Sequence, residues 1–239
     1  MSVLALLITG HPVTVVPVGG RTLEQRASDR LAGHAEVGVV RRVALPATTG
    51  ETANNAETGP EPTGPELVVA ALAAADPAEL AGLPADGVVI VLDPRWVAEL
   101  DSRNTQNSAQ DDQQDDQQDE LRAVLDAVRA GADVAVPGRP VTDTLKRVDG
   151  RGRVLGTVAR ERYLRRGTPW VLAVQVARAG SEVLLRSLGQ AELVPSSVPA
   201  RFVADQVDLD LLGGPLERRA QPIAASLPIS RSATGTSPG

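Results

Sequence analysis

Cysteine is absent from this chain of 239 residues, and histidine occurs only twice, as His11 and His34. A chain without cysteine forms no disulfide, no thiolate zinc site and no cysteine nucleophile, and two histidines disfavour a histidine-rich metal centre. Lysine is nearly as scarce, since Lys146 is the only one. No apolar run approaches the roughly 18 residues of a membrane span, and Val3–Ile8 lacks the basic flank of a signal peptide. These absences favour a cytoplasmic protein.

The formal net charge of −6 is a local property of the chain. Six acidic residues lie between positions 111 and 120, and without them the chain has 24 acidic and 24 basic residues. The remainder has no basic excess that would indicate nucleic-acid binding. With 42% hydrophobic residues, the chain can bury one sizeable core. We therefore expect a single domain over residues 1–212, followed by a disordered tail over residues 213–239 that has no apolar period.

The middle of the chain alternates strands and helices in the way that indicates a parallel sheet. Val88–Leu92 is a continuous apolar run of strand length, as expected for a strand covered on both faces. Apolar residues at i, i+3, i+4 and i+7 predict a helix over Leu121–Ala130, and Val134–Val136 resumes as a strand. A strand, a helix and a strand in this order make a right-handed crossover, so we expect an α/β fold with a three-layer sheet.

Two polar stretches interrupt this pattern, over residues 46–66 and 102–120. Neither has enough apolar residues to offset the entropy of ordering, so we predict a flexible loop and a disordered acidic insert, respectively. Thr22 and Gln25 fit a capping box, which predicts a helix from there to Gly33. The other expected strands are Val3–Ile8, Val13–Val18, Val37–Leu45 and Val171–Val176, and the other expected helices are Leu67–Ala75 and Ser181–Leu188.

A β-hairpin arm is predicted over residues 138–160. The extended runs Val141–Val148 and Arg153–Val158 flank Asp149-Gly150-Arg151-Gly152, which supplies the positive φ angles of a tight reversal. Residues 133–166 hold nine basic and four acidic side chains, and this balance favours anionic ligands such as phosphates. An exposed hairpin with a solvated charged face would look the same at this level, so both interpretations stay open.

The arm sequence PVTDTLKRVDGRGRVLGTVAR, followed by Thr168-Pro169, resembles the 2-C-methyl-D-erythritol 4-phosphate cytidylyltransferase family of the non-mevalonate isoprenoid pathway. The resemblance extends to residues 15–31, 88–95 and 121–137. It implies a nucleotidyltransferase-like, Rossmann-like sheet with a protruding dimerisation arm. It also implies a reaction in which a phosphate oxygen of methylerythritol phosphate attacks the α-phosphorus of CTP in the presence of Mg²⁺, and pyrophosphate leaves.

The family's means of holding the triphosphate are missing from this sequence, so no catalytic residue is intact. The family has a glycine-rich loop after its first strand that ends in Pro-Lys, and a second lysine near the C-terminus. Here only Thr9-Gly10-His11 precede the matching Pro12, and Val13 stands in the place of the first lysine. Phe202, beside Arg201, falls where the second lysine is expected. The family's G-G-x-x-R-x-x-S segment is not recognisable between Leu45 and Val88.

Several residues of the family's sugar-phosphate site are nevertheless present. The resemblance assigns substrate binding to Thr144 and Arg160 in the arm, to Asp93 and Arg95 at a strand end, and to Thr168. In the family, the two arm residues reach across a dimer interface. One residue fewer separates Asp93 from Arg95 than in the family, and Trp170 replaces a glutamine.

Three functions are consistent with this pattern. The chain could be an enzyme that uses CTP and Mg²⁺ for weak cytidylyl transfer. It could instead be a non-catalytic regulatory partner that forms a homodimer, or a heterodimer with a complete cytidylyltransferase, through residues 138–160. It could also bind another sugar phosphate through Arg160 and its neighbours.

Overall fold

The computed structural model describes residues 2–18, 20–45, 64–98, 109–141, 145–151, 153–159, 164–196 and 200–204. Thr144 and Arg160, most of the predicted loop over residues 46–66, and the predicted tail over residues 213–239 lie outside these described residues. Within them, no helix is long and apolar enough to cross a membrane.

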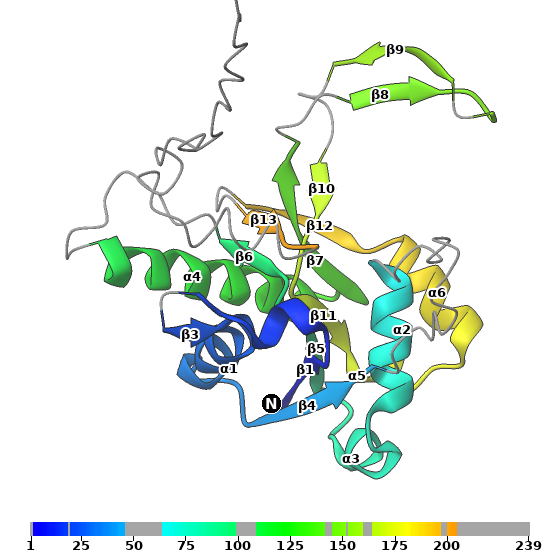
Figure 1. Ribbon diagram of the computed structural model, residues 1–239. Helices are drawn as coiled ribbons and strands as arrows, with labels where there is room; N and C mark the ends of the chain where they lie inside the picture. Colours follow the sequence, from blue (N-terminus) through cyan, green and yellow to red (C-terminus); the bar gives the residue numbers. More distant parts are fainter. Residues whose placement is uncertain are drawn as a thin grey trace, which may run out of the picture.

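A seven-stranded mixed sheet forms the centre of the protein (Figure 1). Its middle is the parallel set β4–β1–β5, in which β1 pairs with β4 on one side and with β5 on the other. The antiparallel strand β11 separates β5 from β7, and β12 pairs in parallel with the opposite edge of β7. The strands are β1 (Val3–Thr9), β4 (Val39–Ala44), β5 (Val88–Leu92), β7 (Val134–Pro140), β10 (Leu164–Arg166), β11 (Trp170–Ala173) and β12 (Glu192–Pro195).

Helices cover both faces of this sheet, which confirms the predicted three-layer α/β class (Figure 1). On one face, α1 (Leu23–Gly33) and α4 (Ala109–Arg129) pack apolar residues such as Leu31 and Leu125 against the sheet. On the other face lie α2 (Pro65–Ala74), α3 (Pro77–Gly82), α5 (Val174–Ala177) and α6 (Ser181–Gly189). Alternate residues of β1 and β5 enter the two cores, because successive side chains of a strand point to opposite faces.

The prediction of disorder over residues 102–120 is wrong from Ala109 onward, because α4 begins there. Leu121, Val124 and Leu125 are fully buried against the sheet, so the second half of α4 is held by packing. A helix fixed in this way extends toward its N-terminus at little further cost, since adding residues to a formed helix is easier than starting one. Acidic residues are also favoured near the positive end of the helix dipole.

Two predicted strands are also wrong in part. The run Val13–Val18 begins instead with a 3₁₀-helix, η1 (Pro12–Val15), because Pro12 starts the turn and Nδ1 of His11 accepts a hydrogen bond from the Val13 amide (3.3 Å). Two short paired strands follow it, β2 (Pro17–Val18) and β3 (Arg21–Thr22). The predicted strand Val171–Val176 ends at Ala173, and α5 begins at Val174, so packing there overrides the β-branched character of Val174 and Val176.

Strands β8 (Leu145–Val148) and β9 (Val154–Val158) pair antiparallel as a ladder of their own, separate from the central sheet. The Asp149 carboxylate accepts hydrogen bonds from the amides of Arg151 (2.9 Å) and Arg153 (3.0 Å) and so shapes the connecting turn. Figure 1 shows this hairpin extending from the body of the protein. Its role as a dimerisation arm stays a prediction.

Candidate functional site

The candidate site lies where β1 and β5 end, because the carboxyl ends of neighbouring parallel strands meet at one edge of a sheet. Two segments leave the sheet at this edge. Thr9 and Gly10 continue β1 into η1, and Asp93 continues β5 toward the short strand β6 (Trp96–Ala98). The predicted site residues Asp93 and Arg95 therefore lie at the expected end of the sheet.

An irregularity between β10 and β11 brings Thr168 to the same place. Arg166 lies opposite Gly138 of β7, whereas Val171 lies opposite Ala135, so residues 167–170 face only residues 136–137 of the partner strand. The extra residues turn the Thr168 side chain toward β5. Its hydroxyl accepts a hydrogen bond from the Asp93 amide (3.2 Å) and donates to the Val91 carbonyl oxygen (3.4 Å).

Asp93 and Arg95 form a buried, two-pronged ion pair. The Arg95 Nε atom lies 3.1 Å from Oδ1 of Asp93, and its Nη2 atom lies 3.0 Å from Oδ2. The Arg95 amide also donates to Oδ1 (3.0 Å). Both side chains are about 5% exposed. The carboxylate is thus committed to its neighbour, and the pair contributes no net charge to the site.

A cavity of about 310 Å³ opens beside this pair. Aromatic rings and arginines form much of its wall. The Arg165 guanidinium lies 4.8 Å from the Trp96 ring, the Arg95 guanidinium 4.9 Å from the Phe202 ring, and the two rings are 5.5 Å apart. The residues around the cavity are Gly64, Pro65, Leu67, Asp93, Arg95, Trp96, Arg165, Arg166, Gly167, Trp170 and Phe202.

Strand pairing explains how the rings of Trp96 and Phe202 meet. β13 (Ala200–Phe202) pairs antiparallel with β6 and places Phe202 directly opposite Trp96. Side chains that face each other across an antiparallel ladder are in contact range. The Val203 amide then donates to the Arg95 carbonyl oxygen (2.9 Å). This hydrogen bond joins the residue after β13 to the segment that follows β5.

A buried ionic cluster touches the cavity wall through Gly167. Oε1 of Glu120 lies 2.6 Å from Nη2 of Arg139 and 3.2 Å from Nη2 of Arg30, and the Ser196 hydroxyl donates to the same carboxylate. Burial lowers the pKa of both Arg30 and Arg139, and the charge of Glu120 opposes that shift. Arg139 lies so close to Gly167 that a Cβ atom there would fall 1.7 Å from its Nη1.

The end of β1 is arranged differently, because a carboxylate of the protein itself occupies it. The Gly10 amide donates to Oε1 of Glu24 (3.4 Å), and the Thr14 hydroxyl lies 2.6 Å from the same oxygen and 2.7 Å from the His11 carbonyl oxygen. Glu24 belongs to the first turn of α1, where a negative charge is favoured by the helix dipole. In a phosphate-binding loop, the hydrogen-bond donors at a strand end point toward the ligand. Here the Gly10 amide and the Thr14 hydroxyl contact the Glu24 carboxylate of the protein itself.

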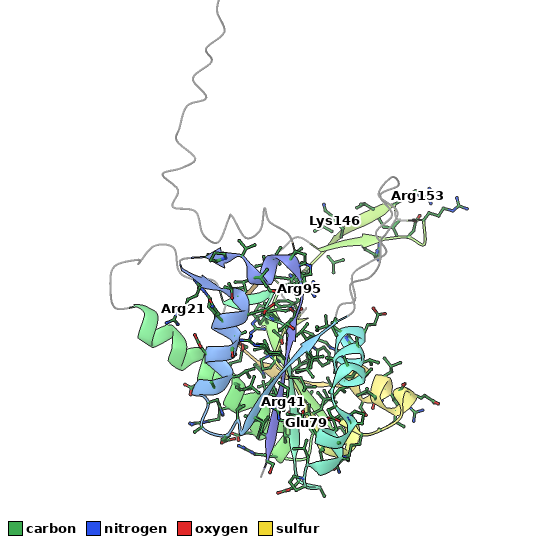
Figure 2. The ribbon with its side chains drawn as sticks, turned by 60° about the horizontal axis from the view of Figure 1, so that its bottom comes forward. Arg21, Arg41, Glu79, Arg95, Lys146 and Arg153 are labelled. Atoms are coloured by element: carbon green, nitrogen blue, oxygen red, sulfur yellow. The ribbon has the colours of Figure 1, made fainter. Side chains whose placement is uncertain are left out.

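Of the five predicted site residues, Asp93, Arg95 and Thr168 lie together, and Thr144 and Arg160 lie outside the described residues. The role of all five residues in substrate binding stays a prediction. Sequence reasoning missed the ring-lined cavity, since residues 96, 170 and 202 are far apart in the chain. The sequence signal that could have pointed to this cavity is the scarcity of aromatic residues, which are only 2% of the sequence. Figure 2 shows Arg95 in the body of the protein, with Lys146 away from it on the hairpin.

Curated relatives match most of the chain. A protein of Saccharopolyspora erythraea named 2-C-methyl-D-erythritol 4-phosphate cytidylyltransferase is 31% identical over 212 residues, covering 83% of this chain and 88% of that protein. A bifunctional enzyme IspD/IspF of Clavibacter michiganensis is 31% identical over 231 residues, covering 90% of this chain. The chain spans about half the length of that bifunctional relative. No family model matches the chain.

Solved structures with the same fold carry related names. A 4-diphosphocytidyl-2C-methyl-D-erythritol synthase superposes with a TM-score of 0.57 at 16% identity, covering 88% of this chain and 96% of that one. A 2-C-methyl-D-erythritol 4-phosphate cytidylyltransferase from Thermus thermophilus superposes with a TM-score of 0.53 at 21% identity, covering 87% and 96% of the two chains. At these identities the likeness shows the fold alone.

Proposed function

Because the chain belongs to the 2-C-methyl-D-erythritol 4-phosphate cytidylyltransferase family, we propose that it is a member that keeps the fold and a small-molecule cavity but performs cytidylyl transfer weakly or not at all. The single observation that carries this proposal is the Glu24 carboxylate at the end of β1, where it accepts from the Gly10 amide and lies 2.6 Å from the Thr14 hydroxyl. A triphosphate bound there would lose these donors and would meet a negative charge.

The two lysines that the family uses to offset that charge are replaced in this sequence. Val13 occupies the position that resembles the family's Pro-Lys lysine, and its side chain is buried in a small apolar cluster with Val18 and Leu23. Phe202 occupies the second lysine position and packs against Trp96. Phosphoryl and nucleotidyl transfer depend mainly on positioning and on cancelling developing charge, so these replacements remove what the reaction needs most.

The described residues hold no ready-made cluster of Mg²⁺ ligands, so a bound ion would rely mainly on the phosphates of the nucleotide. Among them, no three carboxylate, imidazole or thiolate side chains gather in a group that could hold a metal. The Asp93 carboxylate, which lies nearest the cavity, is bound to Arg95.

Pyrophosphate release tests the proposal. The purified protein would be incubated with CTP, methylerythritol phosphate and Mg²⁺, with the Saccharopolyspora erythraea relative as positive control. Because removal of a single stabilising donor commonly costs 10²–10³-fold in rate, we expect release roughly 10³-fold or more below that of the relative. A rate within about tenfold of the relative would overturn the proposal.

A second candidate function is that of a dimerising or regulatory partner, which acts through residues 138–160. It is favoured by Val154 and Leu155 of β9, whose side chains are 61% and 55% exposed on the hairpin. Exposed apolar side chains on an isolated two-stranded ladder are typical of surfaces that pair with another chain. Leu155→Asp should lower the mass in solution if the arm holds two copies together, with Val183→Asp on α6 as the exposed apolar control. An unchanged mass for Leu155→Asp would contradict this assignment.

A further inference from the structure

The aromatic rings of the described residues are concentrated at one place. The sequence has two tryptophans and one phenylalanine, and all three line the cavity at the end of β5. Trp96 and Phe202 come from β6 and β13, and Trp170 of β11 also belongs to one of the two main cores, which are otherwise built largely from valine, leucine and alanine. Three large rings that converge from distant segments give this cavity a character found nowhere else in the described residues. We infer that the cavity binds a small planar ring that carries an anionic group, a carboxylate or a phosphate.

The charge of the cavity selects an anion. Asp93 and Arg95 cancel each other, which leaves Arg165 and Arg166 as the charges that face the space. Within the described part of the chain, the Arg165 guanidinium makes no ion pair or hydrogen bond, and its contact is the Trp96 ring at 4.8 Å. A guanidinium that stacks on a ring keeps its N–H groups in its own plane, free to donate to a carboxylate or phosphate.

Arg166 has a more fixed position. Its Nη1 and Nη2 atoms donate to the carbonyl oxygens of Leu188 (3.1 Å) and Gly189 (2.8 Å) at the end of α6, and its guanidinium lies 6.0 Å from the Trp170 ring. These bonds satisfy carbonyl groups and leave its positive charge uncompensated by any carboxylate in the described residues. Arg166 therefore contributes to the field, whereas Arg165 supplies the donors that contact the anion.

The uncharged part of the wall selects a ring over a polyol. No serine, threonine, asparagine, glutamine, tyrosine or histidine side chain is among the described residues around the cavity. The hydroxyl groups of a sugar would give up their hydrogen bonds to water and find few replacements there, which would weaken binding. A planar ring gives up none and gains contact with Trp170, Leu67 and Pro65. This chemistry differs from that of the sugar phosphate predicted from the sequence.

The dimensions of the cavity agree with a ligand of this size. A volume of about 310 Å³ lies at the lower end of the range for small-molecule sites, roughly 300–1,000 Å³. That space suits one ring with one anionic substituent. Gly64, the N-cap of α2, and Pro65, its first residue, also line it, so the N-terminal end of that helix faces the cavity.

The tryptophans supply a direct readout, because both of them line the cavity and no others exist in the chain. Tryptophan fluorescence would be followed while phenyl phosphate, benzoate, phenol or glycerol phosphate is added. We expect a saturable change with phenyl phosphate, benzoate or both, with a Kd at least about tenfold lower than for phenol or glycerol phosphate. Comparison of the first two probes then distinguishes phosphate from carboxylate.

Variants identify the residues that are responsible for binding and for the change in tryptophan fluorescence. Trp96→Phe and Trp170→Phe each leave a single tryptophan, and both should still report binding. Arg165→Gln should raise the Kd about tenfold, since it removes charge-assisted hydrogen bonds at an exposed side chain whose contact in the described residues is the Trp96 ring. Arg186→Gln is the matched control, because it removes an equally charged side chain that pairs only with Glu182 on α6 in the described residues.

Three results would overturn the inference. They are equal affinity for glycerol phosphate and phenyl phosphate, equal affinity for phenol, and no saturable change with either ring-bearing anion up to about 10 mM. An Arg165→Gln protein that binds like the Arg186→Gln protein would remove the assigned contact. The inference stands apart from the proposed lack of catalysis, because pyrophosphate release and ring binding are measured separately.

Discussion

The ends of β1 and β5 are neighbours in the sheet, yet the charges and hydrogen-bond donors at the two ends are arranged in opposite ways. At the end of β1, Glu24 takes up the donors of Gly10 and Thr14, so the strand end is closed by the protein's own carboxylate. At the end of β5, the only carboxylate around the cavity in the described residues is neutralised by Arg95, and Arg165 and Arg166 face open space. On our two proposals, the end of β1 excludes a triphosphate whereas the end of β5 binds an anion, so neighbouring strand ends of one sheet can differ in their capacity for anions.

The largest expected effect on stability comes from the buried ionic cluster of Glu120, Arg30 and Arg139. Glu120→Ala would leave the buried guanidinium groups of Arg30 and Arg139 facing each other without their shared carboxylate. Breaking a buried ion pair from one side typically costs about 3–5 kcal/mol, so we expect a loss of that order in the free energy of unfolding in urea. Glu182→Ala, at an exposed surface pair, should change it by about 0.5 kcal/mol or less. Equal effects for the two variants would show that the buried cluster contributes no more to stability than an exposed ion pair.

A smaller effect is expected at the floor of the cavity. Gly167→Ala would place a methyl group 1.7 Å from Nη1 of Arg139 and would displace a buried, paired guanidinium. Overpacking of this kind typically costs about 1–3 kcal/mol, and it should also weaken the fluorescence response to phenyl phosphate. Gly189→Ala is the matched control, since nothing lies within 4 Å of its Cβ position. A Gly167→Ala protein as stable as the control would mean that Arg139 is not held beneath the cavity.

The features that could be predicted from the sequence are those formed by residues close together in the chain. Val88–Leu92 was confirmed residue for residue, because a buried strand is a continuous apolar run. The capping box was confirmed by the reciprocal hydrogen bonds between Thr22 and Gln25. Both features are fixed by a few adjacent residues.

Features that depend on distant contacts escaped prediction. The antiparallel strand β11 lies between β5 and β7, and no local pattern reveals that insertion. The Glu24 contacts and the convergence of Trp96 with Phe202 likewise join segments that only the fold brings together. The first half of α4 was predicted to be disordered because its composition is polar, whereas its helix continues from a packed half that begins at Leu121.

A third prediction concerns the closed end of β1. Glu24→Gln removes the charge that faces Gly10 and Thr14, and we expect the free energy of unfolding to fall by about 1 kcal/mol. Glu66→Gln is a matched control, because Glu66 also lies in the first turn of a helix and is exposed. Pyrophosphate release should stay at background in Glu24→Gln, since the missing lysines are not restored. Release that rises to the level of the Saccharopolyspora erythraea relative would show that Glu24 alone closes this strand end.

The smallest effect is expected at the opposite end of the sheet, where Glu36 and Arg129 pair before β4 and β7 begin. The hydrogen bond from Arg129 holds the pKa of Glu36 below its usual range. A depressed folded-state pKa contributes stability that is present above the unfolded value of about 4.3 and is lost as the pH falls through the folded value. Glu36→Gln should therefore weaken the fall in stability below about pH 4.3 without changing anion binding. A variant whose stability falls with acid as steeply as the parent would contradict the pairing.

A single-turnover experiment, with the protein in excess over labelled CTP and with saturating methylerythritol phosphate and Mg²⁺, tests the central claim most directly. It detects even one transfer per molecule, so slow product release cannot hide the chemistry. With the β1 end closed by Glu24, the account predicts that the CTP stays intact while the relative converts its own supply within the same period. Conversion of the bound CTP to CDP-methylerythritol at a rate near that of the relative would contradict it.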